Sequence, residues 1–200
     1  MLNPAEDTMG RTNYIFVDFE NVQETELDRI ANKPVKVALI LGQRHKSLPL
    51  KLVKSIHQFP EQVRLVETTL NGKNALDFVL AYEAGVESQR DPNGYFHVIS
   101  RDTGFDAMIA HLKGKHVLAA RHAAFADIPI LMNAGERVQR FVSHFRANQA
   151  HPKRRDRLES QIQAIFGKAL SPEEIADTIQ GLIREKFIVC SENAEIAYKI

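Results

Sequence analysis

The sequence predicts an α/β fold: a mainly parallel sheet with flanking helices, followed by a small C-terminal module. Segments 14–17 and 95–99 are nearly continuous apolar runs, which suit strands buried on both faces of a helix-covered parallel sheet. Stretches with apolar residues at helical spacing lie between the predicted strands. Strands and helices therefore alternate along the chain, as in βαβ units. A polar, basic stretch near residue 150 then separates the C-terminal module.

The composition limits the class of protein. A chain of 200 residues with 44% apolar residues is long enough for one medium domain with an appendage. The net charge of +1 excludes a generally basic, histone-like protein. The single cysteine, Cys190, excludes an intramolecular disulfide framework and a cysteine-rich zinc site. No signal peptide or membrane-length apolar run is visible, so we expect a soluble, cytoplasmic protein with no membrane partner.

Five strands are expected in the first domain. The first ends at an acid, Asp18, and Gly42 closes the second. The expected strands span residues 14–18, 35–41, 63–67, 95–100 and 116–120. The short apolar segment 128–132 is not assigned to an element.

The expected helices follow from apolar spacing and from stop signals. Pro60 ends one helix because proline cannot continue it, and Gly114 is a typical residue just after another. The expected helices span residues 21–31, 48–59, 74–87, 105–113 and 135–147.

The C-terminal residues predict a separate small module. We expect a first domain at 1–148, a basic linker at 149–157 and a module at 158–200. Ser171 is a favoured helix N-cap, Pro172 suits the first helical position, and Glu174 completes a capping box. Two helices followed by a strand, a turn and a strand predict a winged-helix-like module.

Acidic residues follow two of the predicted buried strands. Asp18 ends the first strand, with Asn21 just beyond it, and Asp102 follows the fourth strand. Asp106 lies in the first turn of the next helix. Ligands bind outside the carboxyl ends of parallel strands, so neighbouring strands would bring these acids together. A cluster of carboxylates repels itself unless a cation lies among them, and such oxygen ligands suit Mg²⁺ or Mn²⁺.

These motifs resemble those of NYN domains, a branch of the PIN-like nucleases. Residues 18–21 (Asp-Phe-Glu-Asn) resemble the Asp-x-x-Asn opening of that family, and 100–106 (Ser-Arg-Asp-Thr-Gly-Phe-Asp) resemble its Ser-x-Asp signature. Residues 73–77 (Lys-Asn-Ala-Leu-Asp) resemble its middle acidic motif. The resemblance covers roughly residues 13–130. One departure is Gly104, where many relatives carry an acid.

The resemblance implies a PIN-like, Rossmannoid sheet and a metal-dependent ribonuclease, in particular an endonuclease acting on single-stranded RNA. The implied catalytic and metal-binding acids are Asp18, Asp77, Asp102 and Asp106. Asn21 would orient the first carboxylate or a substrate phosphate. The C-terminal module is similar to winged-helix appendages of some bacterial relatives, and many PIN-like proteins are homodimers.

Several polar residues are candidates for binding the substrate. Arg44 and Lys46 follow the second strand at the same edge as the acids and would contact phosphates. Lys73 and Asn74 begin the helix of Asp77, where backbone amides favour anions. Ser100 would bind a ligand carboxylate or a phosphate. Arg121 follows the fifth strand and is a candidate of the same kind.

Other interpretations remain open. Each acid could cap or favour the start of a helix instead of binding metal. The same fold could serve as a non-catalytic nucleic-acid-binding or protein-interaction module. A phosphohydrolase for small phosphate esters is a further alternative, although residue 20 is Glu where an aspartyl-phosphate mechanism commonly has a second Asp.

Overall fold

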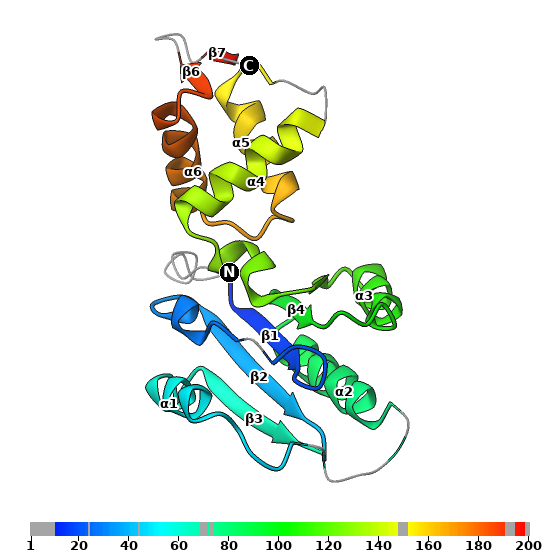
Figure 1. The fold of residues 1–200 in the computed structure, drawn as a ribbon. Helices are drawn as coiled ribbons and strands as arrows, with labels where there is room; N and C mark the ends of the chain where they lie inside the picture. Colours follow the sequence, from blue (N-terminus) through cyan, green and yellow to red (C-terminus); the bar gives the residue numbers. More distant parts are fainter. Residues whose placement is uncertain are drawn as a thin grey trace, which may run out of the picture. The chain divides into compact units, whose positions relative to one another are not determined.

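The structure is a computed structural model that describes residues 11–23, 25–43, 45–68, 72, 74–147, 152–190 and 195–198. The chain divides into two compact units, residues 1–128 and 129–200 (Figure 1). Among the described residues, no helix combines the length and the apolar character that crossing a bilayer requires.

The first unit contains a five-stranded parallel sheet in the order β3-β2-β1-β4-β5. Its strands are β1 (Asn13–Asp18), β2 (Val35–Leu41), β3 (Val63–Glu67), β4 (Tyr95–Ile99) and β5 (Leu118–His122). In the central strand, Val17 lies opposite Leu39 of β2 and Ile99 of β4. The predicted α/β class and parallel sheet are therefore confirmed. The apolar run of β1 suits the central position, where every residue of the strand is buried.

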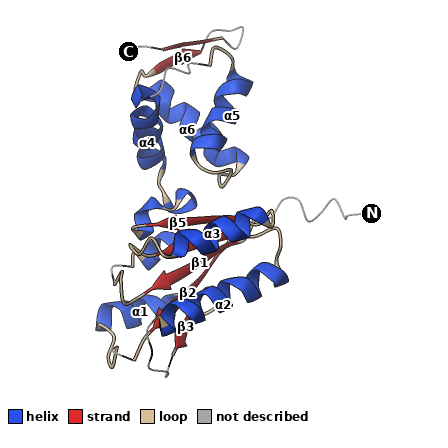
Figure 2. Cartoon of the chain, turned by 90° about the vertical axis from the view of Figure 1, so that its right-hand side faces the viewer, coloured by secondary structure: helices blue, strands red, loops and turns tan. Residues whose placement is uncertain are grey.

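Two helices, α2 (Ala75–Arg90) and α3 (Phe105–Gly114), cover one face of this sheet (Figure 2). Leu80 of α2 and Ile109 of α3 are buried in one core with Phe16 and Phe96 of the central strands. The remaining elements of the unit are η1 (Leu27–Ile30), α1 (Leu50–Gln58) and η2 (Phe125–Asp127). The expected helix at 21–31 is thus a single 3₁₀ turn, and the fifth strand begins two residues later than expected.

A buried histidine joins three strands of the sheet. His97 of β4 is fully buried, and its Nε2 lies 2.9 Å from Asn13 Oδ1. Asn13 donates its amide hydrogen to Arg11 O, so the oxygen faces the ring and His97 Nε2 must donate. His97 Nδ1, 3.0 Å from His122 Nε2, then accepts. Burial, and secondly His122, hold the pKa of His97 well below its ordinary value, so the ring is neutral.

We expect His97 to destabilise the fold in acid. An unfolded histidine titrates near a pKa of about 6.5, whereas the folded ring resists protonation. Above that pH both states are neutral and the effect is absent. Below it the unfolded chain binds a proton that the folded chain does not, so the free energy of unfolding falls by up to about 1.4 kcal/mol per pH unit. Urea unfolding between pH 7.5 and 5 measures this slope.

The matched variants are His97→Gln and His111→Asn, the second replacing an exposed histidine of α3. The free energy of unfolding should depend less steeply on pH in His97→Gln than in the parent, whereas His111→Asn should keep the slope of the parent. Equal slopes in all three proteins would contradict the prediction that His97 causes the loss of stability in acid.

The second unit packs three helices around its own core. They are α4 (Ala134–Ala147), α5 (Arg155–Ile165) and α6 (Pro172–Arg184), with an antiparallel pair of strands, β6 (Ile188–Cys190) and β7 (Ile196–Tyr198). The short η3 (Pro129–Leu131) precedes α4 and covers most of the apolar segment 128–132. Helices and strands follow one another as predicted, and Ser171 and Glu174 form the predicted capping box at the start of α6.

The boundary between the units lies earlier in the chain than predicted. Val138, Phe141 and Phe145 of α4 are buried in the same core as Leu158 of α5 and Leu182 of α6. The helix at 134–147 therefore belongs with the C-terminal residues rather than with the first domain. The end of the predicted linker, residues 155–157, forms the first turn of α5.

Candidate active site

Asp18 is the centre of the candidate site. It ends the central strand β1 and is only 2% exposed. Ser100 Oγ donates to its Oδ2 at 2.8 Å, and the Asn21 amide donates to the same oxygen at 3.0 Å. The Asn21 backbone N–H faces Oδ1 at 3.3 Å. These hydrogen bonds hold the Asp18 side chain in one orientation.

Ser100 connects Asp18 with Asp102. Ser100 is completely buried just after β4, and its Oγ accepts a hydrogen bond from the Asp102 N–H at 3.0 Å. Asp102 is exposed, and its Oδ1 accepts from the Gly104 N–H at 2.7 Å. A β-carbon at Gly104 would lie 3.1 Å from that oxygen, so a side chain there would crowd the carboxylate. Asp102 therefore orders the start of α3 and also lies beside the Asp18 cluster.

Asp77 reaches the same region from the first turn of α2. Its half-buried carboxyl group lines a cavity of about 360 Å³ together with Asp102. Partial burial raises the pKa of Asp77, and the negative charges of Asp18, Asp102 and Glu20 raise it further. The part of this increase that comes from the neighbouring charges reflects repulsion among carboxylates, which a bound cation would relieve.

Asp106 has a different environment. Its carboxylate is bound by Arg121 of β5, with Nε to Oδ1 at 2.6 Å and Nη2 to Oδ2 at 3.2 Å. The hydrogen bonds from Arg121 lower the pKa of Asp106, and the same bonds raise the pKa of Arg121. Arg121 Nη1 also donates to the Ser100 carbonyl at 3.0 Å. The sequence reasoning considered Arg121 only for phosphate binding and missed this pair, because the partners are brought together by the pairing of β4 with β5.

The donor set suits a hard divalent cation. Asp18, Asp77 and Asp102 provide carboxylate oxygens, the ligands that Mg²⁺ and Mn²⁺ prefer. Within the described part of the chain, no three acidic, histidine or cysteine side chains are already arranged around one metal position. Mg²⁺ retains several waters and needs few direct protein ligands, so the chemistry of these carboxylates fits the ion.

The predicted substrate-binding residues fall into three groups. Asn74 is exposed, adopts a left-handed conformation at φ 63° before α2, and lines the cavity with Asp77. Lys46 is exposed in the loop after β2. Asn21, which is exposed, and Ser100, which is buried, both donate hydrogen bonds to Asp18. The other two candidates, Arg44 and Lys73, lie outside the described residues.

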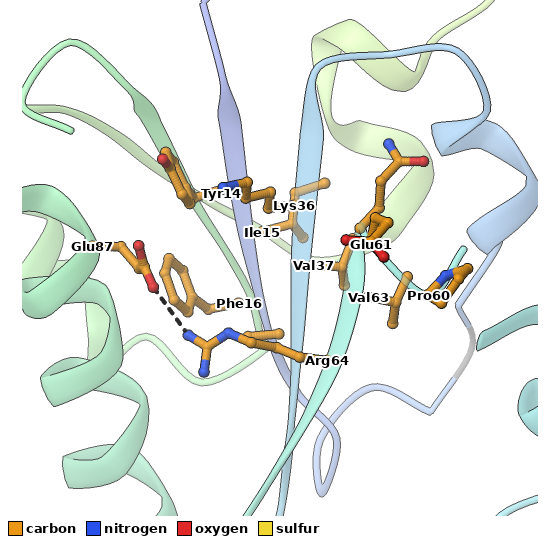
Figure 3. Close-up of a pocket in the computed structure, with 12 residues that line it drawn as sticks. Tyr14, Ile15, Phe16, Lys36, Val37, Pro60, Glu61, Val63, Arg64 and Glu87 are labelled. Atoms are coloured by element: carbon orange, nitrogen blue, oxygen red, sulfur yellow. Dashed lines mark hydrogen bonds and ion pairs between the residues drawn. The ribbon is translucent and has the colours of Figure 1, made fainter. Parts of the chain in front are cut away.

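A second cavity lies at the other end of the sheet. It measures about 220 Å³, and Tyr14, Lys36 and Arg64 reach it from the strands (Figure 3). Arg64 is engaged by Glu83 at 2.7 Å and by Glu87 at 3.5 Å. None of the predicted acids lines this cavity, so the candidate active site is the acidic cluster at the carboxyl ends of the strands.

Comparison with known proteins identifies the domain that carries this cluster. No curated protein and no solved structure is significantly similar to the chain. The family model described as the PIN domain matches residues 12–122, more than half of the 200 residues, and the match spans the whole sheet from β1 to β5. With its parallel sheet and its acids at the carboxyl ends of β1 and β4, the chain belongs to the PIN domain family.

Proposed function

We propose that this protein is a metal-dependent endoribonuclease that hydrolyses phosphodiester bonds in single-stranded RNA. PIN domains are generally metal-dependent nucleases that use Mg²⁺ or Mn²⁺. The observation that carries the proposal is the proximity of three carboxylates from separate elements, Asp18 and Asp102 being close enough to act on the charge of Asp77. Asp18 and Asp102 are joined through Ser100, and Asp77 shares a cavity with Asp102.

In this proposal Asp18, Asp77 and Asp102 would hold the metal. A bound Mg²⁺ or Mn²⁺ supplies an activated water and stabilises charge on the phosphate oxygens. Ser100 and Asn21 keep the Asp18 carboxylate in place, which reduces the reorganisation needed when substrate binds. Asp106 is the proposed fourth acid. Its carboxylate accepts two hydrogen bonds from Arg121, whose positive charge already compensates it in part.

The finer assignments rest on resemblance. The motifs at 18–21 and 100–106 favour the NYN branch of the family and RNA as substrate. The order α5, α6, β6, β7 favours a winged-helix-like module in the second unit. Lys46 and Asn74, with Arg44 and Lys73, are proposed to contact RNA phosphates. The location is proposed to be the cytoplasm, and a homodimer is the proposed assembly.

The test is cleavage of end-labelled single-stranded RNA with Mg²⁺, Mn²⁺ or EDTA, comparing the parent with Asp102→Asn. We expect metal-dependent cutting by the parent and a fall of about 100-fold or more in the variant, the size typical of losing a charge-stabilising group. Asp28→Asn, which replaces an exposed acid of η1, is the control and should retain activity. A single-stranded DNA of the same sequence tests the preference for RNA.

One observation favours a second candidate, a nucleic-acid-binding module without catalysis. The carboxylate of Asp106, the proposed fourth acid, is paired with Arg121. RNA binding by the parent that is insensitive to EDTA, with no cutting under any metal condition, would support this candidate over the nuclease.

A further inference from the structure

The cavity beside the acidic site is lined by residues of two chemically different kinds. Asp77 and Asp102 provide carboxylates. Phe78 and Ala81 of α2, with Phe105 and Met108 of α3, provide apolar walls. Its volume of about 360 Å³ falls within the range of roughly 300–1,000 Å³ found for small-ligand sites. The two helices lie side by side over the sheet, so the cavity is built on rigid elements (Figure 2).

Phe78 is unusual among the residues that line this cavity. It follows Asp77 directly on α2, yet its ring is 71% exposed. An exposed phenylalanine presents a flat apolar surface to solvent at the mouth of a polar site. Tyr82, one turn further along α2, is exposed to a similar degree, 69%, but does not line the cavity. The two rings therefore form a natural pair of test and control.

We infer that Phe78 is a stacking residue for a base of the single-stranded RNA, next to the phosphate that is cut. This inference rests on the proposed nuclease function and names the part of the substrate that the cavity takes. A nucleotide joins an anionic phosphate to a flat base, and the site joins metal-binding carboxylates to an exposed ring. Aliphatic chains would not use the carboxylates, and small anions would not use the ring.

The apolar walls also determine what the site can distinguish. The side chains of Phe78, Ala81, Phe105 and Met108 carry no strong hydrogen-bonding group, so they cannot read the edge of a base. Every base has a π-face, and aromatic stacking is therefore tolerant of sequence. Stacking on Phe78 accordingly favours a base at this position without selecting which one.

The experiment compares the parent with Phe78→Ala, Phe78→Tyr and Tyr82→Ala on a set of RNAs in which single positions around the cut are made abasic. Phe78→Ala should lower kcat/KM on intact RNA by about 5- to 100-fold, the range expected for losing one stacked base. Phe78→Tyr keeps the ring and should stay within a factor of about 3 of the parent. Tyr82→Ala should match the parent. Thermal unfolding confirms that the exposed substitutions leave the fold intact.

The abasic substrates provide the readout that a general structural effect would not produce. At one position next to the cut, removing the base should lower kcat/KM of the parent by the same factor as the Phe78→Ala substitution lowers it on intact RNA. Removing that base should not lower kcat/KM of the Phe78→Ala variant any further. The inference would be overturned if Phe78→Ala lost the same factor in kcat/KM on intact RNA and on the abasic RNA of every position, or if it lost no activity at all. Either result would still be consistent with the proposed nuclease function. A parent that neither cuts nor binds the labelled RNA would overturn both.

Discussion

Asp18→Asn should abolish metal-dependent cleavage while preserving the fold. The substitution removes one negative charge from the centre of the acidic cluster but keeps the shape of the side chain. We expect kcat/KM to fall on the order of 1,000-fold, equivalent to about 4 kcal/mol of lost transition-state stabilisation. The effect should exceed that of the Asp102 variant, because Asp18 is buried and held by Ser100 and Asn21, whereas Asp102 is exposed.

The structural cost of this substitution should be small. An amide at position 18 can still accept from Ser100, but it places an N–H₂ group against the Asn21 backbone N–H. Losing that hydrogen bond costs about 1 kcal/mol, and removing one of the mutually repelling charges offsets part of it. Thermal unfolding, Mn²⁺ calorimetry and RNA cleavage measure the effects of Asp18→Asn on stability, metal binding and catalysis separately. A variant that binds Mn²⁺ and cuts RNA at more than a tenth of the parent rate would show that Asp18 is structural.

Arg137→Met should strongly destabilise the second unit. Arg137 of α4 is only 5% exposed, and its Nε donates to Thr178 Oγ1 at 3.1 Å. Its Nη1 donates to the Met132 carbonyl at 2.7 Å and lies 3.4 Å from Glu174 Oε1. One guanidinium thus connects the residue after η3 with two sites on α6. Methionine fills similar space but satisfies none of these acceptors.

The expected loss is about 3 kcal/mol of unfolding free energy, the lower end of the cost of breaking a buried ion pair, because Glu174 keeps some contact with water. Urea unfolding of the full chain, followed by circular dichroism, measures it. Arg184→Met replaces an exposed arginine at the end of α6 and should change stability by less than about 0.5 kcal/mol. Equal unfolding midpoints for the two variants would mean that Arg137 is not a structural anchor.

The sequence by itself determined the class of fold and the positions of the acids along it. The apolar run before Asp18 predicts a buried central strand because a strand covered on both faces has no polar face. The capping box at Ser171 is predicted correctly because it depends only on residues three apart in the chain. The acids at the carboxyl ends of β1 and β4 follow from local sequence and from the rule that parallel strands end at one edge.

Only the tertiary structure decided which side chains meet. Asp106 pairs with Arg121 because β5 lies beside β4, and Ser100 reaches Asp18 because β4 lies beside β1. The helix at 134–147 joins the second unit because its apolar face packs against α5 and α6, although its sequence pattern would suit either unit. Local sequence limits the conformation of each segment, whereas these contacts depend on the order of strands and the packing of helices far apart in the chain. Charge pairing and burial are properties of that packing, and so the tertiary structure decided the environment of each acid.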